Sequence, residues 1–186
     1  MALANSTPVL EEPSEPWLIA ASRGGSADAL GALYERHATA LLALAYRLLQ
    51  SVPDAEDVVH DVFVGLPEAL RRYQERGTFS AWLRTVTARV ALARLRQAAT
   101  RDLVSLEAGG QPAAPRRDLE GVISLDTAMR RLAPSLRAVL VLKEIEGFTH
   151  AEIARMLDIS VGASEVRLHR AIGALRAALV SPREER

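Results

Sequence analysis

The amino-acid sequence predicts an all-α protein of two small helical domains joined by a flexible linker, the C-terminal one a helix-turn-helix. Apolar residues recur at steps of three and four on both sides of residues 98–122, which is the spacing of one helix face. Residues 98–122 lose that period and contain residues typical of a linker: Gly109, Gly110, Pro112 and Pro115. Residues 149–179 show two helical periods separated by a tight turn. We therefore expect a disordered tail at 1–16, an N-terminal domain at 17–97, the linker at 98–122 and a C-terminal domain at 123–181.

The composition is that of a globular protein and excludes several classes of function. Of 186 residues, 49% are hydrophobic and 25% are charged, unlike a disordered chain. The chain has no cysteine, which excludes disulfides, thiol redox chemistry and thiolate zinc sites. No apolar run approaches the roughly 20 residues of a membrane span, and the N-terminus lacks the pattern of a secretory signal. We expect a cytoplasmic protein without membrane insertion, cofactor or metal.

The charges are unevenly distributed, although the formal net charge is zero. Residues 53–70 contain five acids and no lysine or arginine, whereas residues 71–101 contain eight arginines and one acid. Adjacent segments of opposite sign indicate two surfaces for different partners.

In the N-terminal domain, Ser26 is placed to cap a helix that runs to about Gln50. We interpret His37, which lies on the apolar face of this helix, as a hydrogen-bonded core histidine rather than a ligand. The predicted apolar face consists of Leu30, Tyr34, His37, Leu41, Leu44 and Leu48. Pro53 fits the first turn of the next helix, and Pro67 is expected to kink or end that helix.

One face of this second helix is acidic. Asp57, Asp61, Val64 and Glu68 follow one another at steps of four, three and four, so they share a face. The stripe is either a solvated surface or a docking site for a basic partner, and the helix by itself does not decide between them.

A third helix is expected over residues 79–97, with a core face made of Phe79, Leu83, Val86 and Val90. On a neighbouring face, Trp82, Arg89 and Arg96 recur at seven-residue spacing. An aromatic ring beside guanidinium groups offers single-stranded nucleic acid a stacking platform and phosphate neutralisation. The same pattern also fits a solvated helix with one half-buried tryptophan.

The predicted linker is long on the scale of duplex DNA. Fully extended, about 25 residues reach roughly 80 Å, more than two turns of duplex at about 34–36 Å each. Two DNA-contacting domains joined by it can therefore occupy separate sites. After the linker we expect helices near residues 124–132 and 134–146, with a core of Leu132, Leu136, Val139 and Leu140.

Residues 149–179 fit a DNA-reading helix-turn-helix. Thr149 and Glu152 are spaced as a capping box for the first helix, and Ser160 is a good N-cap for the second. The second helix has an apolar back of Val161, Ser164, Leu168, Ile172, Leu175 and Leu179. Its front is small and basic, with Ala163, Val166, Arg170 and Gly173 flanked by Arg167 and His169. A basic front on the second helix is typical of reading in the major groove, and two helices of an ordinary bundle are the alternative.

Three segments resemble extracytoplasmic-function (ECF) sigma factors. DAEDVVHDVF at residues 54–63 is similar to the helix with which this family binds core RNA polymerase, and RGTFSAWL at residues 76–83 is similar to its strand-opening segment. ISVG at residues 159–162 followed by RLHRA at residues 167–171 resembles its promoter-reading domain. The resemblance covers roughly residues 27–97 and 123–179, with the segments in the family's order.

The resemblance implies separate partner surfaces and no bond chemistry by the protein itself. It implies docking on the clamp helices of the largest core polymerase subunit through Asp54, Asp57, Asp61, Val64 and Glu68. It implies capture of unpaired bases of the −10 element through Arg76, Phe79, Trp82, Arg89 and Arg96. It also implies contact with the flap of the second-largest subunit and reading of the −35 element of promoter DNA through Ala163, Glu165, Val166, Arg167, His169 and Arg170. An anti-sigma factor is a further candidate partner, which the resemblance leaves open.

Five residues depart from the family's usual pattern: Pro67, Arg89, Ala93, Ser164 and Glu165. Pro67 stands where tryptophan is usual, and Arg89 and Ala93 stand where Asn and Asp are frequent. Ser164 replaces a core valine and Glu165 a lysine, although a glutamate near the major groove can accept a hydrogen bond from a cytosine amino group. The family's base preferences at −10 and −35 therefore do not transfer to this chain.

Two other classes of function are open on the sequence. An autonomous helix-turn-helix regulator would bind duplex DNA tightly without polymerase. A metal-dependent enzyme would use Asp57, His60 and Asp61, although no nucleophile or glycine-rich loop accompanies them.

Overall fold

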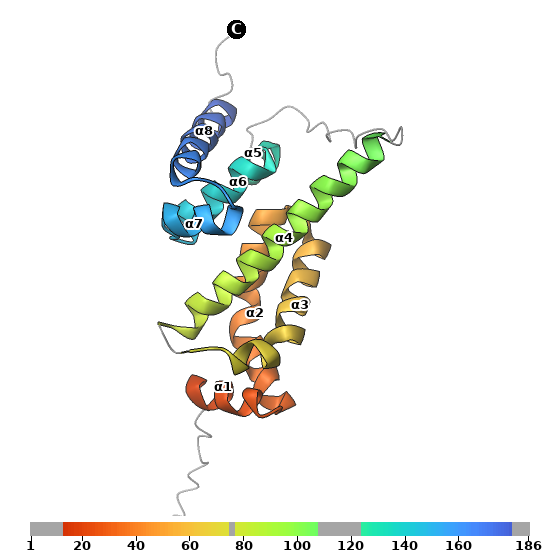
Figure 1. The fold of residues 1–186 in the computed structure, drawn as a ribbon, viewed down its shortest axis with the longest axis vertical. Helices are drawn as coiled ribbons and strands as arrows, with labels where there is room; N and C mark the ends of the chain where they lie inside the picture. The colour runs from red at the N-terminus through yellow and green to blue at the C-terminus, as the bar shows by residue number, and fades with distance from the viewer. Residues whose placement is uncertain (1–12, 75–76, 108–123, 180–186) are drawn as a thin grey trace, which may run out of the picture.

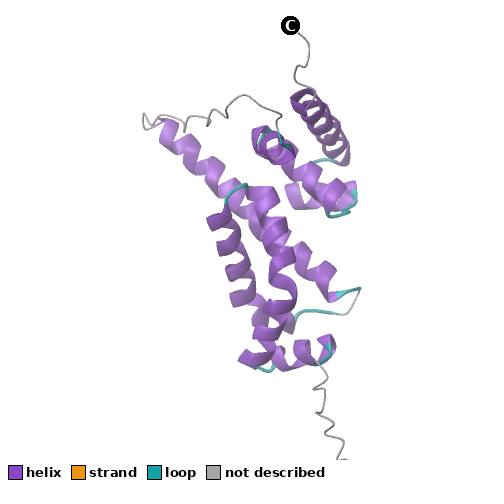
Figure 2. Ribbon diagram, turned by 180° about the vertical axis from the view of Figure 1, so that it is seen from behind, coloured by secondary structure: helices purple, strands orange, loops and turns teal. Residues whose placement is uncertain are grey.

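The computed structural model describes residues 13–74, 77–107 and 124–179, with side chains for all of these except 102–107. Throughout these ranges the chain forms helices and connecting turns, without a strand (Figures 1 and 2). The all-α prediction is thereby confirmed.

Four helices build the N-terminal half: α1 (Glu15–Arg23), α2 (Ala27–Leu49), α3 (Val52–Arg71) and α4 (Phe79–Glu107). α2, α3 and α4 run alongside one another, and α1 packs across the ends of α2 and α3 (Figure 1). Ser26 caps α2 as predicted, accepting a hydrogen bond from the backbone N–H of Ala29. The apolar faces of these helices enclose a core that includes Leu18, Leu33, Leu41, Leu66 and Leu83.

α1 begins at Glu15, so Glu15 and Pro16, which the sequence assigned to a tail, belong to a helix. Pro16 lies in the first turn, where its missing N–H costs little, and Leu18 and Ile19 are buried in the core. Glu15 also reaches α2, where its Oε1 lies 3.0 Å from Nε2 of His37. The hydrogen bond predicted for His37 is therefore present, and its side chain is partly buried, at 14% exposed.

α3 continues past the proline that was expected to kink or end it. Pro67 lies inside α3, which runs on to Arg71 with Leu66 and Leu70 buried. A proline inside a helix costs about 3 kcal/mol or more, because it removes a backbone hydrogen bond and its ring clashes with the preceding turn. Burial of the two leucines on either side of Pro67 offsets that cost.

α4 runs to Glu107, ten residues beyond the predicted end at residue 97. Residues 98–107 contain neither glycine nor proline, so nothing in them stops the helix. The predicted start of the linker at residue 98 is therefore wrong, and residues 108–123 lie outside the described residues.

The C-terminal half consists of α5 (Leu125–Arg131), α6 (Pro134–Leu140), α7 (His150–Leu157) and α8 (Val161–Leu179). A π-helical turn, η1 (Val141–Ile145), directly follows α6, so the single helix predicted over residues 134–146 widens at its end. There the N–H of Glu146 donates to the carbonyl of Val141, five residues back, at 3.0 Å. Gly147 then ends the segment with a φ of 76°, a conformation that favours glycine.

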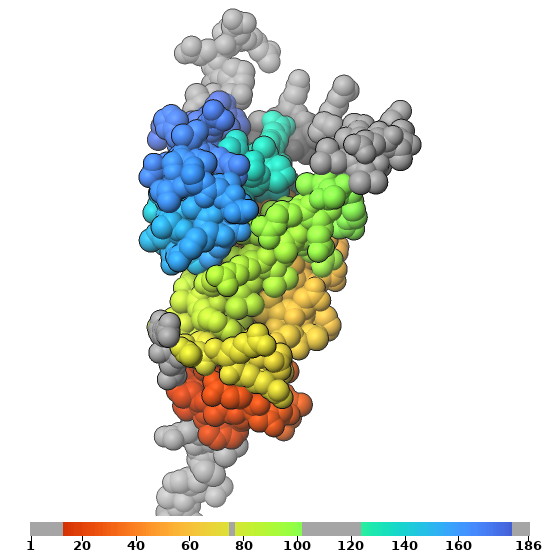
Figure 3. All heavy atoms as spheres, viewed as in Figure 1, coloured from red at the N-terminus to blue at the C-terminus, as the bar shows by residue number. Residues whose placement is uncertain are grey.

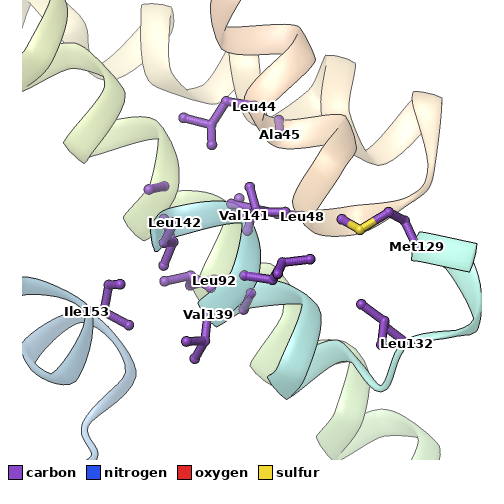
Figure 4. Close-up of a cluster of buried hydrophobic side chains, with 14 of the residues drawn as sticks. Leu44, Ala45, Leu48, Leu92, Met129, Leu132, Val139, Val141, Leu142 and Ile153 are labelled. Carbon is purple, nitrogen blue, oxygen red and sulfur yellow. The ribbon is translucent and has the colours of Figure 1, made fainter. Parts of the chain in front are cut away.

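The two halves pack against each other through a shared hydrophobic core (Figure 4). Leu44 and Leu48 of α2 and Leu92 of α4 lie beside Val141 and Leu142 of the C-terminal half. Met129, Leu132, Val139 and Ile153 extend the same cluster. The two predicted helical regions are present, and they meet because α2 and α4 carry apolar side chains that the N-terminal core does not cover.

Polar contacts reinforce this packing. Arg137 of α6 is only 5% exposed and donates from Nε to the carbonyl of Leu48 and from Nη1 to that of Leu132, both at 3.1 Å. Its burial lowers the pKa of Arg137, since the charge is held away from water. Arg47 of α2 pairs with the largely buried Glu146 at 3.2 Å.

Candidate functional site

Three surfaces contain the side chains singled out in the sequence. The acidic face of α3 consists of Asp54, Asp57, Asp61, Val64 and Glu68. The arginine face of α4 consists of Trp82, Arg89 and Arg96, and the reading face of α8 of Ala163, Glu165, Val166, Arg167, His169 and Arg170. On the side of the molecule shown in Figure 3, α4 crosses between α3 and the C-terminal half.

The acidic face is open to solvent. The side chains of Asp54, Asp57 and Asp61 are 47%, 62% and 58% exposed, and Val64 is 67% exposed. This face forms because the apolar residues of α3 are buried on its other side, as Val58, Val59, Val62 and Leu66. The acidic face thus offers a partner both negative charge and an apolar contact.

An arginine that the sequence did not single out contacts three of these carboxylates. Arg94 of α4 donates from Nε to Asp54 at 3.1 Å and from Nη2 to Asp57 at 2.5 Å, and its Nη1 lies 3.8 Å from Asp61. A hydrogen bond with Ser51, together with that from Arg94, lowers the pKa of the Asp54 carboxyl. Although burial disfavours its charge, hydrogen bonds to Asp54 and Asp57 raise the pKa of Arg94.

A cluster of aromatic rings holds Trp82 on the arginine face. The partly buried ring of Trp82 stacks on that of Phe79, with centroids 5.6 Å apart, and the ring of Tyr73 lies 4.8 Å from Trp82. Phe79 itself is only 2% exposed, so direct contact of Phe79 with DNA does not fit this conformation, and its ring supports Trp82 instead. Arg76, the other residue expected here, lies outside the described residues.

The two arginines of the arginine face are exposed. Arg96 donates from Nη1 to the carbonyl of Met156, in the last turn of α7, at 3.4 Å. An open surface pocket adjoins Arg96. Its lining residues on α4 are Ala93, Arg96, Gln97, Thr100 and Arg101. The arginine face therefore extends to the C-terminal half.

The helix-turn-helix has the predicted caps. The hydroxyl of Thr149 accepts a hydrogen bond from the N–H of Glu152 at 3.2 Å, and the Glu152 carboxylate accepts one from the N–H of Thr149 at 2.8 Å. The backbone hydrogen bond from Thr149 is the main reason that the pKa of Glu152 is lowered. Asp158 turns the chain with a φ of 53°, and Ser160 caps α8 through the N–H of Ala163 at 3.0 Å.

The reading face points to solvent. Glu165, Val166, His169 and Arg170 are exposed, and Ala163 and Arg167 are partly exposed. Behind this face, the buried hydroxyl of Ser164 shares a hydrogen bond with Nδ1 of His150 on α7, at 2.9 Å. This bond satisfies the buried hydroxyl of Ser164, so Ser164 and His150 join α7 to α8.

The residues considered for a metal-dependent enzyme are not assembled as a metal site. Within the described ranges, no group of three or more His, Asp or Glu side chains is arranged to hold a metal ion. His60 is exposed, and Asp57 and Asp61 contact Arg94 instead.

Among the helices of the described ranges, none has the length and apolar character needed to cross a membrane.

Two family models match the chain. Residues 33–101 match Sigma-70 region 2, a range that contains the acidic and arginine faces, and residues 123–175 match Sigma-70 region 4, a range that contains α7 and most of α8. The two matched regions, in this order, define a factor of the sigma-70 class.

Curated relatives narrow this class. CarQ, an RNA polymerase sigma factor of Myxococcus xanthus, is 31% identical over 160 residues that span 83% of this chain and 91% of CarQ. The ECF RNA polymerase sigma factor SigE of Mycolicibacterium smegmatis is 31% identical over 155 residues, which are 77% of this chain and 59% of the length of SigE. The chain belongs to the extracytoplasmic-function RNA polymerase sigma factors. Proteins of this family are not enzymes.

Solved structures share the fold. CnrH in complex with the cytosolic domain of CnrY is 30% identical with a TM-score of 0.53, over 87% of this chain and 94% of that chain. The sigma factor RpoE in complex with the anti-sigma factor NepR from Bartonella quintana has a TM-score of 0.59, over 82% of this chain and 98% of that chain. Its identity is 20%, so this second likeness concerns the fold.

Proposed function

We propose that this chain binds core RNA polymerase, directs it to promoters and takes part in opening the DNA there. The observation that carries the proposal is the presence of three exposed surfaces of different chemistry on one sigma-family chain. The acidic face and the arginine face lie on adjacent helices of one half, and the reading face lies on the other half.

The acidic face is proposed to dock on the clamp helices of the largest polymerase subunit. Its carboxylates supply charge complementarity to a basic partner, which favours correct and rapid association. Val64, exposed among them, supplies an apolar contact that docking would remove from water. Glu68, 64% exposed, extends the same surface toward the end of α3.

The arginine face is proposed to hold the melted strand of the −10 element. Stacking one base on an aromatic ring is worth roughly 1–3 kcal/mol, and Trp82 offers such a ring with Phe79 and Tyr73 in support. Arg89 and Arg96 would neutralise phosphates beside it. Because Arg96 donates to Met156 in this conformation, that hydrogen bond must break before Arg96 turns to DNA.

The reading face is proposed to enter the major groove at the −35 element. Arg167, His169 and Arg170 are suited to phosphates and guanine, and Glu165 is suited to accept a hydrogen bond from a cytosine amino group. Contact of the C-terminal half with the flap of the second-largest subunit belongs to the same proposal. Residues 13–107 and 124–179 would then act as two promoter-contacting units.

An anti-sigma protein is a candidate partner in this proposal. CnrH, a relative of the same fold, was solved with the cytosolic domain of CnrY bound. A protein that covers the acidic or the arginine face of the present chain would exclude polymerase or DNA from it.

Arg89→Ala tests the assignment of the arginine face. We expect this variant to bind core polymerase and closed promoter DNA normally, because Arg89 is exposed and removed from the acidic face. Open-complex formation is expected to fall about tenfold, the worth of one charge-assisted hydrogen bond. Permanganate footprinting of unpaired thymines measures the effect, and a pre-melted −10 bubble should restore part of the transcription.

Arg131→Ala is the matched control for Arg89→Ala. Arg131 is exposed on α5 and lies outside all three surfaces, so its loss changes the net charge equally. If the Arg89 variant opens the duplex as well as this control, the arginine face does not contact the melted strand.

A further inference from the structure

Arg94 lies at the centre of the acidic face. Its Nε, Nη1 and Nη2 atoms each face a different carboxylate, those of Asp54, Asp61 and Asp57, at 3.1, 3.8 and 2.5 Å. The side chain of Arg94 is 28% exposed, whereas those of the three aspartates are about twice as exposed. The side chain of Arg94 is thus less exposed as a whole than those of the three aspartates, whose outer surface stays open to a partner.

The three carboxylates do not depend on Arg94 for their position. Their spacing on α3 already places them on one face, and the Asp54 carboxylate has a further side-chain hydrogen bond with Ser51. The main effect of Arg94 is therefore on charge. Three carboxylates and one guanidinium leave the centre of the acidic face with a charge of −2 instead of −3.

We propose that Arg94 determines the affinity of the acidic face by competing with the polymerase for its carboxylates. The inference rests on the proposed function of that face. A partner cation that binds the outer surface of the aspartates comes near the guanidinium of Arg94. Repulsion between two like charges about 7 Å apart lowers a binding constant roughly three- to fiftyfold, depending on how well solvent screens the charges. Arg94 thus weakens docking, and an uncharged residue in its place strengthens it.

The test measures the dissociation constant of core RNA polymerase for three full-length variants. Arg94→Gln removes the charge and keeps a donor, Arg94→Met removes the charge and keeps the apolar stem, and Arg94→Lys keeps the charge. At about 50 mM salt we expect the Gln and Met variants to bind about three- to tenfold more tightly than the wild type, and the Lys variant to bind like the wild type. At about 0.5 M salt the gain should shrink below twofold, because the Debye length falls to about 4 Å. A purely structural role for Arg94 would not produce this dependence on charge and salt.

Asp57→Asn distinguishes failure of the inference from failure of the proposed function. This variant is expected to weaken polymerase binding. Wild-type affinity of Asp57→Asn would overturn the acidic face as a docking surface, and the role of Arg94 with it. Thermal unfolding first checks that both uncharged Arg94 variants are folded. If Asp57→Asn weakens polymerase binding while these two variants bind no more tightly than the wild type, the acidic face is still the docking surface, but Arg94 does not compete with the polymerase.

Discussion

Replacing Asp57 and Asp61 together by asparagine is expected to weaken the binding of core RNA polymerase by about 30-fold or more. Both side chains are more than half exposed in the free protein and would be covered by the clamp helices in the complex. Removing one side of close charge pairs at an interface costs about 2–5 kcal/mol, most of it because the partner's charges are left without a counterion. Affinity measured by fluorescence anisotropy with labelled core enzyme checks this expectation.

The asparagine substitutions are preferable to charge reversal. Two arginines at these positions would place like charges beside Arg94, which contacts both aspartates. Asparagine retains an acceptor for Arg94. Asp28→Asn with Glu144→Gln is the matched control, since it removes two exposed carboxylates that lie outside the acidic face. Equal affinity of the two double variants would contradict the docking assignment.

Replacing Arg137 by methionine is expected to lower the free energy of unfolding by about 2–4 kcal/mol. The buried carbonyls of Leu48 and Leu132 would lose their Arg137 donors, and each buried group left unpaired costs about 1–3 kcal/mol. Methionine carries no charge, so the substitution also removes the cost of burying the guanidinium, which offsets part of this loss. Because Leu48 belongs to α2 and Arg137 to α6, the substitution also removes a link between the two halves.

Urea unfolding of the full chain measures this effect. The wild type is expected to unfold in one transition, since its halves share a core, and the Arg137 variant at a lower urea concentration. Arg131→Ala, which removes an exposed charge from the neighbouring helix, should change the stability by less than about 0.5 kcal/mol. A similarly small change for Arg137→Met would show that its hydrogen bonds contribute little.

Local patterns predicted much of this fold and of the candidate surfaces. The capping box of Thr149 and Glu152 and the cap by Ser160 are set by residues three apart in the sequence, so they can be predicted without tertiary structure. The exposure of Val64 likewise follows from the apolar period of α3, which assigns the buried positions to the other side of the helix. The burial of Phe79 agrees with its predicted place on the core face of α4, whereas the stacking of Trp82 on it was not predicted.

Contacts between distant segments account for what the sequence did not predict. Arg94 is one of eight arginines between residues 71 and 101. The three aspartates that it contacts lie up to forty residues earlier in the sequence, so only the packing of α4 against α3 shows which arginine is their partner. The hydrogen bond between Ser164 and His150 could not be predicted without knowing how α7 packs against α8. The shared core of the two halves was missed because Leu44, Leu48 and Leu92 fit the core of a single domain equally well.

Run-off transcription with purified core RNA polymerase on a library of promoter fragments tests whether this chain directs the enzyme to promoters. Core enzyme with this chain is expected to start transcription from a subset of fragments that share sequences at −35 and −10, and core enzyme alone is not. The free chain should bind duplex weakly, since affinity for DNA rests largely on phosphate neutralisation and the net charge is zero. If core enzyme with this chain gives no specific start, while the free chain binds one duplex site tightly at physiological salt, the chain acts as an autonomous regulator and not as a sigma factor.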